Sequence, residues 1–290
     1  MQKPAIVILG VGRLGSALAC LARDCGYPLT AITAGHRETA VAFSRATSIP
    51  AYFDNVEAAA QGDIILITVP DRILPVVLEE LIVGKRLRPG QVLLHTSGVL
   101  SGEALAAARQ FGTSVGSMHP LQSFAGIETA RKSLSGSAFA IDGDPEAVDA
   151  ASRLAIDLGG KALRVPPEER VLYHAAACIA SNYLVALLHV AEKLLARWTT
   201  EDKEALQALL PLVTGTLRNV AQQGTAGALT GPIVRGDAST VAQHLKALPQ
   251  DFLDVYQILG QEALKLSADR IPVAEREAIG SLLSADKKNH

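Results

Sequence analysis

Three glycines near the start of the chain have the spacing of a dinucleotide-binding turn. They follow the apolar segment Ala5–Leu9 and precede the helical segment Ser16–Asp24. The first glycine permits a tight bend, the second lets a pyrophosphate approach the backbone, and the third lets the helix pack on the strand. The helix N-terminus then holds the phosphate charge; the alternative is a glycine-rich turn without a ligand. The predicted phosphate-binding residues are Gly10, Gly12, Arg13, Leu14 and Gly15.

The residues after the second apolar segment select the cofactor. An NAD-binding chain usually places Asp or Glu about 20 residues beyond the glycines, on the ribose hydroxyls. Here the segment reads Thr33-Ala-Gly-His36-Arg37, and the first acid is Glu38. A carboxylate would repel a 2′-phosphate, whereas Arg37, helped by Thr33 and His36, would attract it. We therefore predict NADP, the alternative being that Arg37 is a solvated loop cation.

Small or polar residues follow three further apolar segments, as Val69-Pro70-Asp71, Ser97-Gly98 and His119-Pro120. Because open α/β sheets bind ligands at the carboxyl ends of their strands, we expect Val69, Pro70 and Ser97 to contact the cofactor. His119 is the candidate proton donor or acceptor, since a histidine of ordinary pKa titrates near neutral pH. Ser97 would polarise the reacting oxygen or nitrogen. The alternative is ordinary turn chemistry, because Pro-Asp and Ser-Gly are common turn dipeptides.

Polar residues recur at a four-residue spacing in the apolar segment Glu168–Trp198. His174, Cys178 and Asn182 would lie on one face of a helix. Buried polar groups cost roughly 1–3 kcal/mol each unless they are paired. We therefore predict that this face lines the substrate cleft, with His174 binding substrate and Asn182 polarising the reacting atom. Alternatively, His174 and Asn182 are satisfied groups at a helix–helix or subunit interface.

A glycine- and proline-containing loop precedes a later helix and holds a second cluster of polar residues. It reads Gly231-Pro-Ile-Val-Arg235-Gly-Asp237-Ala-Ser239-Thr240. Asp237 or Ser239 can cap the helix that follows. Arg235 and Thr240 are candidates to bind a carboxylate or phosphate of the substrate. The alternative is an Arg235–Asp237 pair that stiffens the turn.

Short apolar segments alternate with helical ones before Pro166-Pro167. Segments such as Ile64–Thr68 are continuously apolar, as strands buried on both faces of a parallel sheet are. This pattern predicts an α/β fold with a Rossmann-type, doubly wound, mostly parallel sheet. The expected strands are Ala5–Leu9, Leu29–Thr33, Ala51–Phe53, Asp63–Val69, Gln91–Thr96, Ser114–His119, Ala138–Ile141 and Ala162–Val165.

The pattern after the two prolines is entirely helical. We therefore predict an NADP-binding domain at residues 1–166 and an all-α domain at residues 167–290, which completes the substrate cleft and dimerises. The expected helices are Glu168–Trp198, Glu201–Leu212, Val213–Gln223, Ser239–Ala247 and Asp251–Ala268.

Composition excludes several classes of protein. The 290 residues are 49% hydrophobic and 19% charged, which excludes a disordered or low-complexity chain. Lysine and arginine number 27 against 29 acidic residues, and aromatics are 4%, so nothing indicates nucleic-acid binding. The three cysteines have no CxxC spacing, so we predict neither a disulfide framework nor a metal site.

The segment His174–Ala191 is long enough to span a bilayer. It contains polar residues such as Ser181 and His189, which are costly in lipid. We therefore predict a buried core helix in a cytoplasmic protein rather than a membrane span. Because Glu168–Trp198 is more apolar than one small domain can easily bury, we also expect a homodimer through the helical domain.

The chain resembles Rossmann-like proteins with a DUF2520 C-terminal domain. The resemblance implies a fold similar to pyrroline-5-carboxylate reductase, ketopantoate reductase and the 6-phosphogluconate dehydrogenase superfamily, whose C-terminal domain is helical. It also implies an NADP-binding dimer in which the helical domains pack together. The matching stretches are Gly10–Gly15, Val69–Asp71, His95–Gly98, His119–Gln122, Tyr173–Ala176, Ser181–Tyr183 and Leu229–Asp237.

The expected activity is NADP-dependent hydride transfer between nicotinamide and a small, anionic C=O, C=N or C–OH compound. The chain has no lysine near Asn182, unlike ketopantoate reductase and 6-phosphogluconate dehydrogenase, which speaks against either activity. The His119-Pro120 pair is similar to one in prephenate and arogenate dehydrogenases, which makes that activity one alternative. The other is a non-enzymatic NADP-binding redox sensor or regulatory module, which the missing lysine and the apolar second domain favour.

Overall fold

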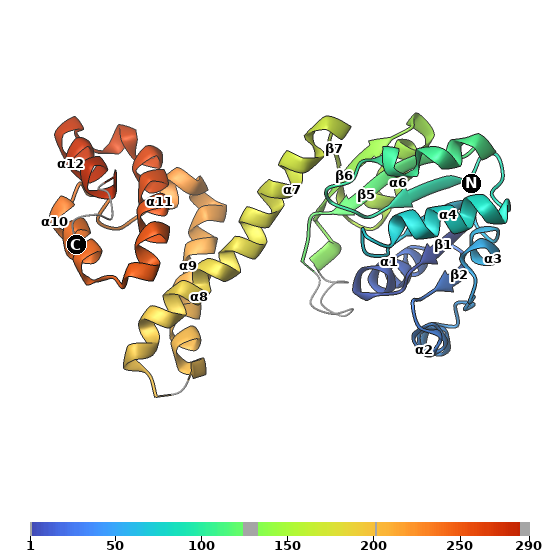
Figure 1. The fold of residues 1–290 in the computed structure, drawn as a ribbon, viewed down its shortest axis with the longest axis horizontal. Helices are drawn as coiled ribbons and strands as arrows, with labels where there is room; N and C mark the ends of the chain where they lie inside the picture. Colours follow the sequence, from blue (N-terminus) through green and yellow to red (C-terminus); the bar gives the residue numbers. More distant parts are fainter. Residues whose placement is uncertain (1, 124–132, 201, 285–290) are drawn as a thin grey trace. The chain divides into compact units, whose positions relative to one another are not determined.

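The computed structural model describes residues 2–123, 133–200 and 202–284 (Figure 1). The chain divides into two compact units, residues 1–183 and 184–290. The first unit extends past Pro166-Pro167, where the sequence analysis placed the domain boundary. It does so because Arg170, just after the prolines, is buried against Asp142 of the sheet.

A seven-stranded sheet forms the centre of the first unit, in the order β2-β1-β3-β4-β5-β6-β7. Strands β1 to β5 are parallel, β6 runs antiparallel to β5, and β7 is parallel to β6. The predicted mostly parallel, Rossmann-type sheet is therefore confirmed. The strands are β1 (Ile6–Leu9), β2 (Leu29–Thr33), β3 (Ile64–Ile67), β4 (Val92–His95), β5 (Ser114–Pro120), β6 (Ala138–Gly143) and β7 (Lys161–Arg164).

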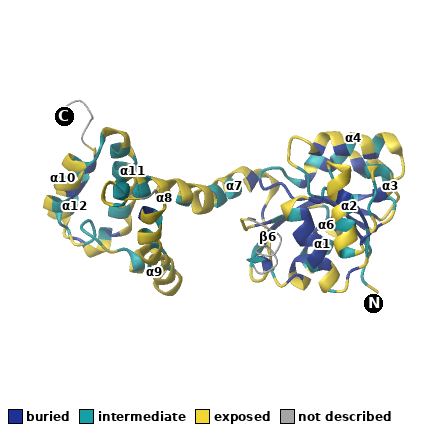
Figure 2. Ribbon diagram, turned by 90° about the horizontal axis from the view of Figure 1, so that it is seen from below, coloured by how far each residue is buried: buried dark blue, intermediate teal, exposed yellow. Residues whose placement is uncertain are grey.

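Helices cover both faces of this sheet. Ile6 and Ile8 of β1 point into an apolar cluster with α1 (Arg13–Asp24) and α6 (Pro145–Asp157). Val7 and Leu9 point the other way. They pack with α3 (Asn55–Ala59), α4 (Leu74–Gly84) and the 3-10 helix η1 (Gly102–Phe111). Because both faces are covered, the strands are continuously apolar in sequence, and Figure 2 shows the buried centre that results.

One expected strand is absent from the described part of the sheet. In the segment Ala51–Phe53, Ala51 makes only an isolated parallel bridge to Ile32, and the Phe53 side chain is exposed. This segment instead leads from α2 (Arg37–Thr47) to α3. Its apolar residues predicted a strand, but its pairing with β2 is limited to this bridge.

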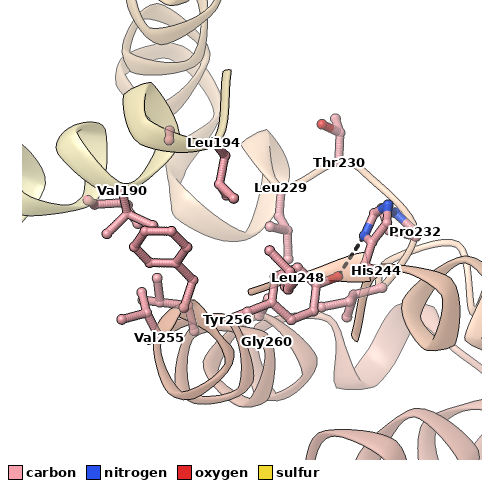
Figure 3. A pocket seen from close by; sticks show the side chains of 16 residues that line it. Val190, Leu194, Leu229, Thr230, Pro232, His244, Leu248, Val255, Tyr256 and Gly260 are labelled. Carbon is pink, nitrogen blue, oxygen red and sulfur yellow. Dashed lines mark hydrogen bonds between the residues drawn. The ribbon is translucent and has the colours of Figure 1, made fainter. Parts of the chain in front are cut away.

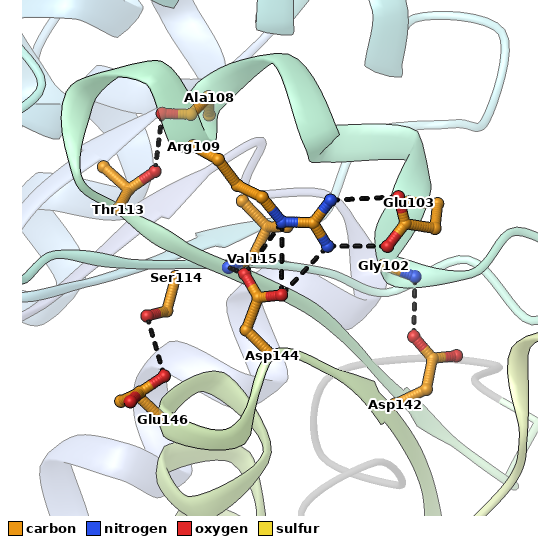
Figure 4. A network of polar contacts seen from close by, with 10 residues as sticks. All are labelled: Gly102, Glu103, Ala108, Arg109, Thr113, Ser114, Val115, Asp142, Asp144 and Glu146. Carbon is orange, nitrogen blue, oxygen red and sulfur yellow. Dashed lines mark hydrogen bonds and ion pairs between the residues drawn. The ribbon is translucent and has the colours of Figure 1, made fainter.

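A network of ion pairs fixes the start of η1 (Figure 4). Arg109 donates hydrogen bonds to Asp144 at 2.9–3.1 Å and to Glu103 at 2.6 and 3.0 Å. Asp144 also accepts a hydrogen bond from the Val115 backbone N–H at 2.9 Å. The network ties η1 to β5 and to the turn before α6, so it also holds the loop that connects β4 to η1.

The second unit is helical. The two helices expected between Glu201 and Gln223 are one helix, α9, which continues through Pro211 and is interrupted only at Gly224, where φ is +72°. Helix α12 was not predicted from the sequence. It forms a small core with α10 through Val241, Ile279 and Leu283. The helices are α8 (Leu184–Leu195), α9 (Asp202–Ala228), α10 (Ala238–Ala247), α11 (Gln250–Leu266) and α12 (Val273–Ser284).

The long helical segment Pro167–Trp198 contains α7 (Arg170–Cys178), a π-helical turn (Ile179–Tyr183) and α8. By length and composition it could cross a membrane, yet none of its most apolar window is buried. The prediction of a buried core helix is therefore wrong for the single chain. Val171, Leu172 and Val185 each expose about two-thirds of their surface, and Figure 2 shows α7 and α8 largely exposed.

Candidate active site

The glycine turn is tightly packed on one side and open on the other. Gly10 has a φ of +105°, and a Cβ there would lie 2.8 Å from Val69 Cγ1. A Cβ on Gly15 would collide with the Gly10 carbonyl and with the Thr68 hydroxyl. At Gly12, by contrast, a Cβ would meet nothing within 4 Å. The open side therefore leaves space for a ligand next to the backbone.

Helix α1 begins directly at this open side. Gly12 caps it without any side-chain hydrogen bond, and its first turn carries no acidic residue. The backbone N–H groups of such a turn favour an anion. The Thr68 hydroxyl donates to the Gly10 carbonyl at 2.7 Å, which joins the end of β3 to the turn. The loop therefore fits the pyrophosphate of a dinucleotide.

The end of β2 provides one accessible cation. Arg37 begins α2, and its guanidinium carbon lies 3.9 Å from the centroid of the Phe53 ring. Stacking on a ring leaves the N–H edge of a guanidinium available for hydrogen bonds to an anion. The Thr33 hydroxyl already has another hydrogen-bond partner, because it donates to Asn55 Oδ1 at 2.7 Å. Sequence reasoning missed Phe53, which it placed in a strand.

Ser97 and Asp71 join the ends of β4 and β3. The Ser97 hydroxyl donates to Asp71 Oδ2 at 2.8 Å and accepts hydrogen bonds from the N–H groups of Val99 and Leu100 at 3.3 and 3.1 Å. The single hydroxyl proton of Ser97 is therefore already donated to Asp71. Ser97 reaches the predicted edge of the sheet, but it can donate to a ligand only if this bond is exchanged.

His95 positions the same loop. Its Nδ1 accepts a hydrogen bond from the Ser97 N–H at 3.2 Å, so its Nε2 carries the proton and donates to the Ser101 carbonyl at 2.8 Å. Burial lowers the pKa of His95, so the ring is neutral. We therefore assign it a positioning role in the fold, next to the candidate site.

Three aromatic side chains meet at the end of β5. His119 Nδ1 lies 2.8 Å from the Tyr173 hydroxyl, and the His119 ring makes edge contacts with Tyr173 and His174 at centroid distances of 5.7 and 6.1 Å. A Cβ on Gly98 would lie 3.0 Å from His119 Nε2 and would collide with the His174 ring. The structure therefore brings His119 and His174 together against the loop that carries Ser97.

His119 does not have the near-neutral pKa that the sequence analysis assumed. Burial, the Arg170 cation and His174 lower the pKa of His119 to about 4, with Asp71 opposing them. The imidazole is therefore neutral at pH 7 and presents one N–H and one bare nitrogen.

A buried ion pair lies beside this cluster. Arg170 Nε donates to Asp142 Oδ2, and both side chains are almost fully buried. Asp142 Oδ1 also accepts a hydrogen bond from the Gly102 N–H at 2.6 Å. The pair anchors the start of α7, and with it Tyr173 and His174, to β6. Sequence reasoning missed it, because nothing near Arg170 in sequence indicates its partner.

The other predicted site residues stay predictions. His174 Nδ1 lies 3.8 Å from Cys178 Sγ, but the π-helical turn interrupts the four-residue spacing before Asn182, which is exposed. In the second unit Arg235 is exposed, and the Thr240 hydroxyl donates to Asp237 Oδ2 at 2.6 Å. Asp237 also caps α10, as expected for one of the two candidate capping residues.

The second unit also contains a mostly apolar cavity of about 390 Å³ (Figure 3). Val190, Leu194, Leu248 and Val255 are among its lining residues. Within residues 2–123, 133–200 and 202–284, no three His, Cys, Asp or Glu side chains gather where they could hold a metal ion.

Comparison with known proteins identifies both domains. Residues 2–120 match the domain family described as Rossmann-like, and residues 137–263 match the domain of unknown function DUF2520. The chain joins a Rossmann-like domain to a DUF2520 domain. The family resemblance inferred from the motifs is therefore confirmed. No curated protein matches the chain in sequence.

Several solved structures share the fold of this chain. Protein TM1727 from Thermotoga maritima is 23% identical, covers 95% of this chain and 98% of its own, and has a TM-score of 0.67. A Plasmodium falciparum pyrroline carboxylate reductase with NADP bound is 13% identical, with 98% and 100% covered and a TM-score of 0.60. An NADH-preferring ketol-acid reductoisomerase from an uncultured archaeon is 15% identical, with 96% and 82% covered and a TM-score of 0.63. The fold is thus one that oxidoreductases use, with either nicotinamide cofactor.

Proposed function

We propose that this protein is an NADP-dependent oxidoreductase that transfers hydride between nicotinamide and a small, anionic compound with a C=O, C=N or C–OH group. The observation that carries the proposal is the order of groups along one edge of the sheet. The open glycine turn follows β1, the Ser97–Asp71 pair follows β3 and β4, and His119 follows β5. Open α/β sheets bind dinucleotides along this edge.

The residues at the edge fit such a cofactor. Backbone N–H groups from Gly12 to Gly15 would hold the pyrophosphate, and Arg37 would hold the 2′-phosphate that distinguishes NADP from NAD. Val69, Pro70 and Ser97 would line the nicotinamide. The cofactor supplies the hydride, so the protein has to orient the substrate and move one proton.

His119 would exchange that proton with the substrate. Its Nε2 lies at the Gly98 end of the loop, on the edge where the nicotinamide would bind. A correctly positioned proton donor or acceptor contributes roughly 10²–10⁴ to the rate. Within this proposal His174 binds the anionic substrate and Asn182 polarises the reacting atom. Arg235 and Thr240 stay separate candidates for binding an anionic group.

The test is a hydride-transfer screen. NADPH oxidation is followed against 2-oxo acids and cyclic imino acids, and NADP⁺ reduction against 2-hydroxy acids and arogenate. We expect turnover with one of these classes, and a loss of about 100-fold or more in His119→Asn with unchanged NADPH affinity. His189→Asn, on exposed α8, is the matched control. Tight NADPH binding with no hydride transfer to any class would contradict the proposal.

A non-enzymatic NADP-binding sensor is the second candidate. Its specific support is that the Ser97 and Thr33 hydroxyls already donate hydrogen bonds within the protein, to Asp71 and Asn55. In addition, the pKa of His119 is well below 7. The same screen separates the two, because a sensor binds the nucleotide without transferring hydride.

We also propose that the protein is a cytoplasmic homodimer joined through its helical domain. The exposed apolar residues of α7 and α8 support this, since a monomer leaves them in water at a cost of roughly 25 cal/mol for each Å². An apolar cavity in the same domain adds to the apolar surface that a partner subunit could cover.

A further inference from the structure

We propose that Tyr173 fixes the position of the proton on His119, and that the site is thereby built for a carbonyl substrate rather than an imine. The inference about the substrate class rests on the oxidoreductase function proposed above, whereas the inference about the proton position does not. The observation behind it is the pairing of Tyr173 on α7 with His119 at the end of β5.

The hydrogen bond between the two side chains has a definite direction. The Tyr173 hydroxyl lies 2.8 Å from His119 Nδ1, and no other acceptor for its proton is within hydrogen-bonding distance in the described part of the chain. A phenol O–H, with an ordinary pKa near 10, is a much stronger donor than the N–H of a neutral imidazole. Tyr173 therefore donates and His119 Nδ1 accepts.

A neutral imidazole carries a single N–H, so the direction of this bond sets the tautomer. With Nδ1 accepting from Tyr173, the hydrogen must be on Nε2. The neutral state follows from the surroundings: burial and the positive charge of Arg170 disfavour the imidazolium, as do His174 and His95, and Asp71 alone opposes them.

His119 Nε2 lies at the edge of the sheet where the substrate would be reduced. Nε2 is 3.0 Å from the position that a Cβ on Gly98 would occupy, so it is close to the β4–η1 loop. An N–H donor there pairs with the oxygen of a carbonyl, which is an acceptor. The reactive form of an imine is the protonated iminium. Its N–H is also a donor, so it cannot form a hydrogen bond with the Nε2–H of His119. The tautomer therefore selects ketones or aldehydes.

The proton balance of the reduction follows from the same pair. A bound NADPH would supply the hydride for the carbonyl carbon. The carbonyl oxygen would take the proton from His119 Nε2, and Nδ1 would take the proton of Tyr173. The phenolate would then take up H⁺ from the solvent, so the sum is one carbonyl, one NADPH and one H⁺ giving one alcohol and NADP⁺. Arg170 lies 5.9 Å from the Tyr173 ring centroid and would stabilise the transient phenolate. Tyr173 thus acts through His119 and is a positioning residue.

Nitrogen-15 NMR of histidine-labelled protein tests the proton position directly, with His119→Asn used to assign the signals. At pH 7 we expect His119 to be neutral with its hydrogen on Nε2. Tyr173→Phe should convert it to a mixture of both tautomers. The chain offers a matched control, because the Tyr256 hydroxyl lies 2.8 Å from His244 Nδ1 in the second unit. Tyr256→Phe should alter the His244 signals and leave those of His119 unchanged.

Steady-state kinetics test the inference about the substrate class. We expect NADPH to reduce a 2-oxo acid but not the cyclic imine of matched carbon number, and Tyr173→Phe to lower kcat about 10- to 100-fold with little change in KM. A hydrogen on Nδ1, or an imidazolium at pH 7, would overturn the tautomer assignment. Reduction of the imine alone would overturn the substrate class. If no class of the hydride-transfer screen is turned over, the oxidoreductase function fails, and the NMR result still decides what Tyr173 does.

Discussion

Arg37 is the residue through which the protein would distinguish the two nicotinamide cofactors. Its contact with a 2′-phosphate is charge-assisted and therefore worth about 1.5–3 kcal/mol, a 10- to 150-fold effect. Because Arg37 is exposed, we expect the lower end, and a smaller effect at high salt. Arg37→Ala should raise the dissociation constant of NADPH about tenfold and leave that of NADH nearly unchanged.

Titration calorimetry with both nucleotides checks this prediction. Arg45→Ala is the matched control, because Arg45 is an exposed cation in the last turn of the same helix and is far along the chain from the end of β2. Equal NADPH and NADH affinities in the parent protein would contradict the assignment. So would an equal loss for both nucleotides in Arg37→Ala.

A pH-dependent stability follows from the buried state of His119. Its pKa is about 4 in the folded protein, against an ordinary value near 6.5 in the unfolded chain. Between these values the unfolded chain binds a proton that the folded chain does not, so stability falls as the pH falls from about 6.5 to 4. The loss reaches up to about 3 kcal/mol at the acid end.

Urea unfolding at several pH values measures this loss. His119→Asn should have a shallower decline between pH 6.5 and 4, because the other titrating groups, including His95, are common to both proteins. Identical pH profiles for the parent and His119→Asn would show that His119 is protonated equally in the folded and unfolded chains.

At the residue scale, sequence spacing finds the groups whose partners are local. The glycine turn, Ser97 and His119 all follow apolar segments, and the rule that ligands bind at strand ends identifies them. Tyr173, Arg170 and Phe53 could not be found in this way. Their significance comes from partners more than ten residues away, or from stacking that requires the folded backbone.

At the scale of elements, the Arg170–Asp142 pair connects α7 to the sheet. Asp142→Ala leaves a buried, unpaired guanidinium, which should cost about 3–5 kcal/mol of unfolding free energy. Replacing both residues, as Asp142→Leu with Arg170→Met, removes both charges, so the double variant should be more stable than Asp142→Ala alone.

Denaturant unfolding of Asp142→Leu, of Arg170→Met and of the double variant completes the cycle. A strong deviation from additivity is expected, because the two side chains are in direct contact. Additive losses would mean that the pair contributes nothing as a pair and that another contact anchors α7.

The elements themselves were predictable where their patterns were strong. Continuous apolar runs gave the strands, since both faces of the sheet are covered. The errors have physical causes. Ala51–Phe53 makes one bridge to β2 and places Phe53 against Arg37, so its apolar residues do not form a strand. Helix α9 continues through Pro211, where a helix was expected to end. The apolar composition of Pro167–Trp198 predicted that this helix is buried. Whether it is buried depends on which other segments contact it, and its own sequence does not specify them.

At the scale of the whole molecule, the exposed apolar surface of α7 and α8 predicts a dimer. Light scattering at micromolar concentration should give twice the mass of the chain. Val185→Glu, on α8, should produce a monomer, because it places a charge on this surface. Val83→Glu is the control, since Val83 is exposed to a similar extent, at 71% against 67% for Val185, but belongs to α4 of the Rossmann-like domain. A monomeric parent protein would contradict the prediction.

The central claim is that one edge of the sheet binds NADP and brings its nicotinamide to His119. A crystal structure of the protein with NADP⁺ tests this claim most directly. We expect the pyrophosphate on the Gly10–Gly15 turn, the 2′-phosphate against Arg37, and the nicotinamide ring beside Gly98 and His119. A nicotinamide ring bound away from His119, or a 2′-phosphate that does not contact Arg37, would contradict it.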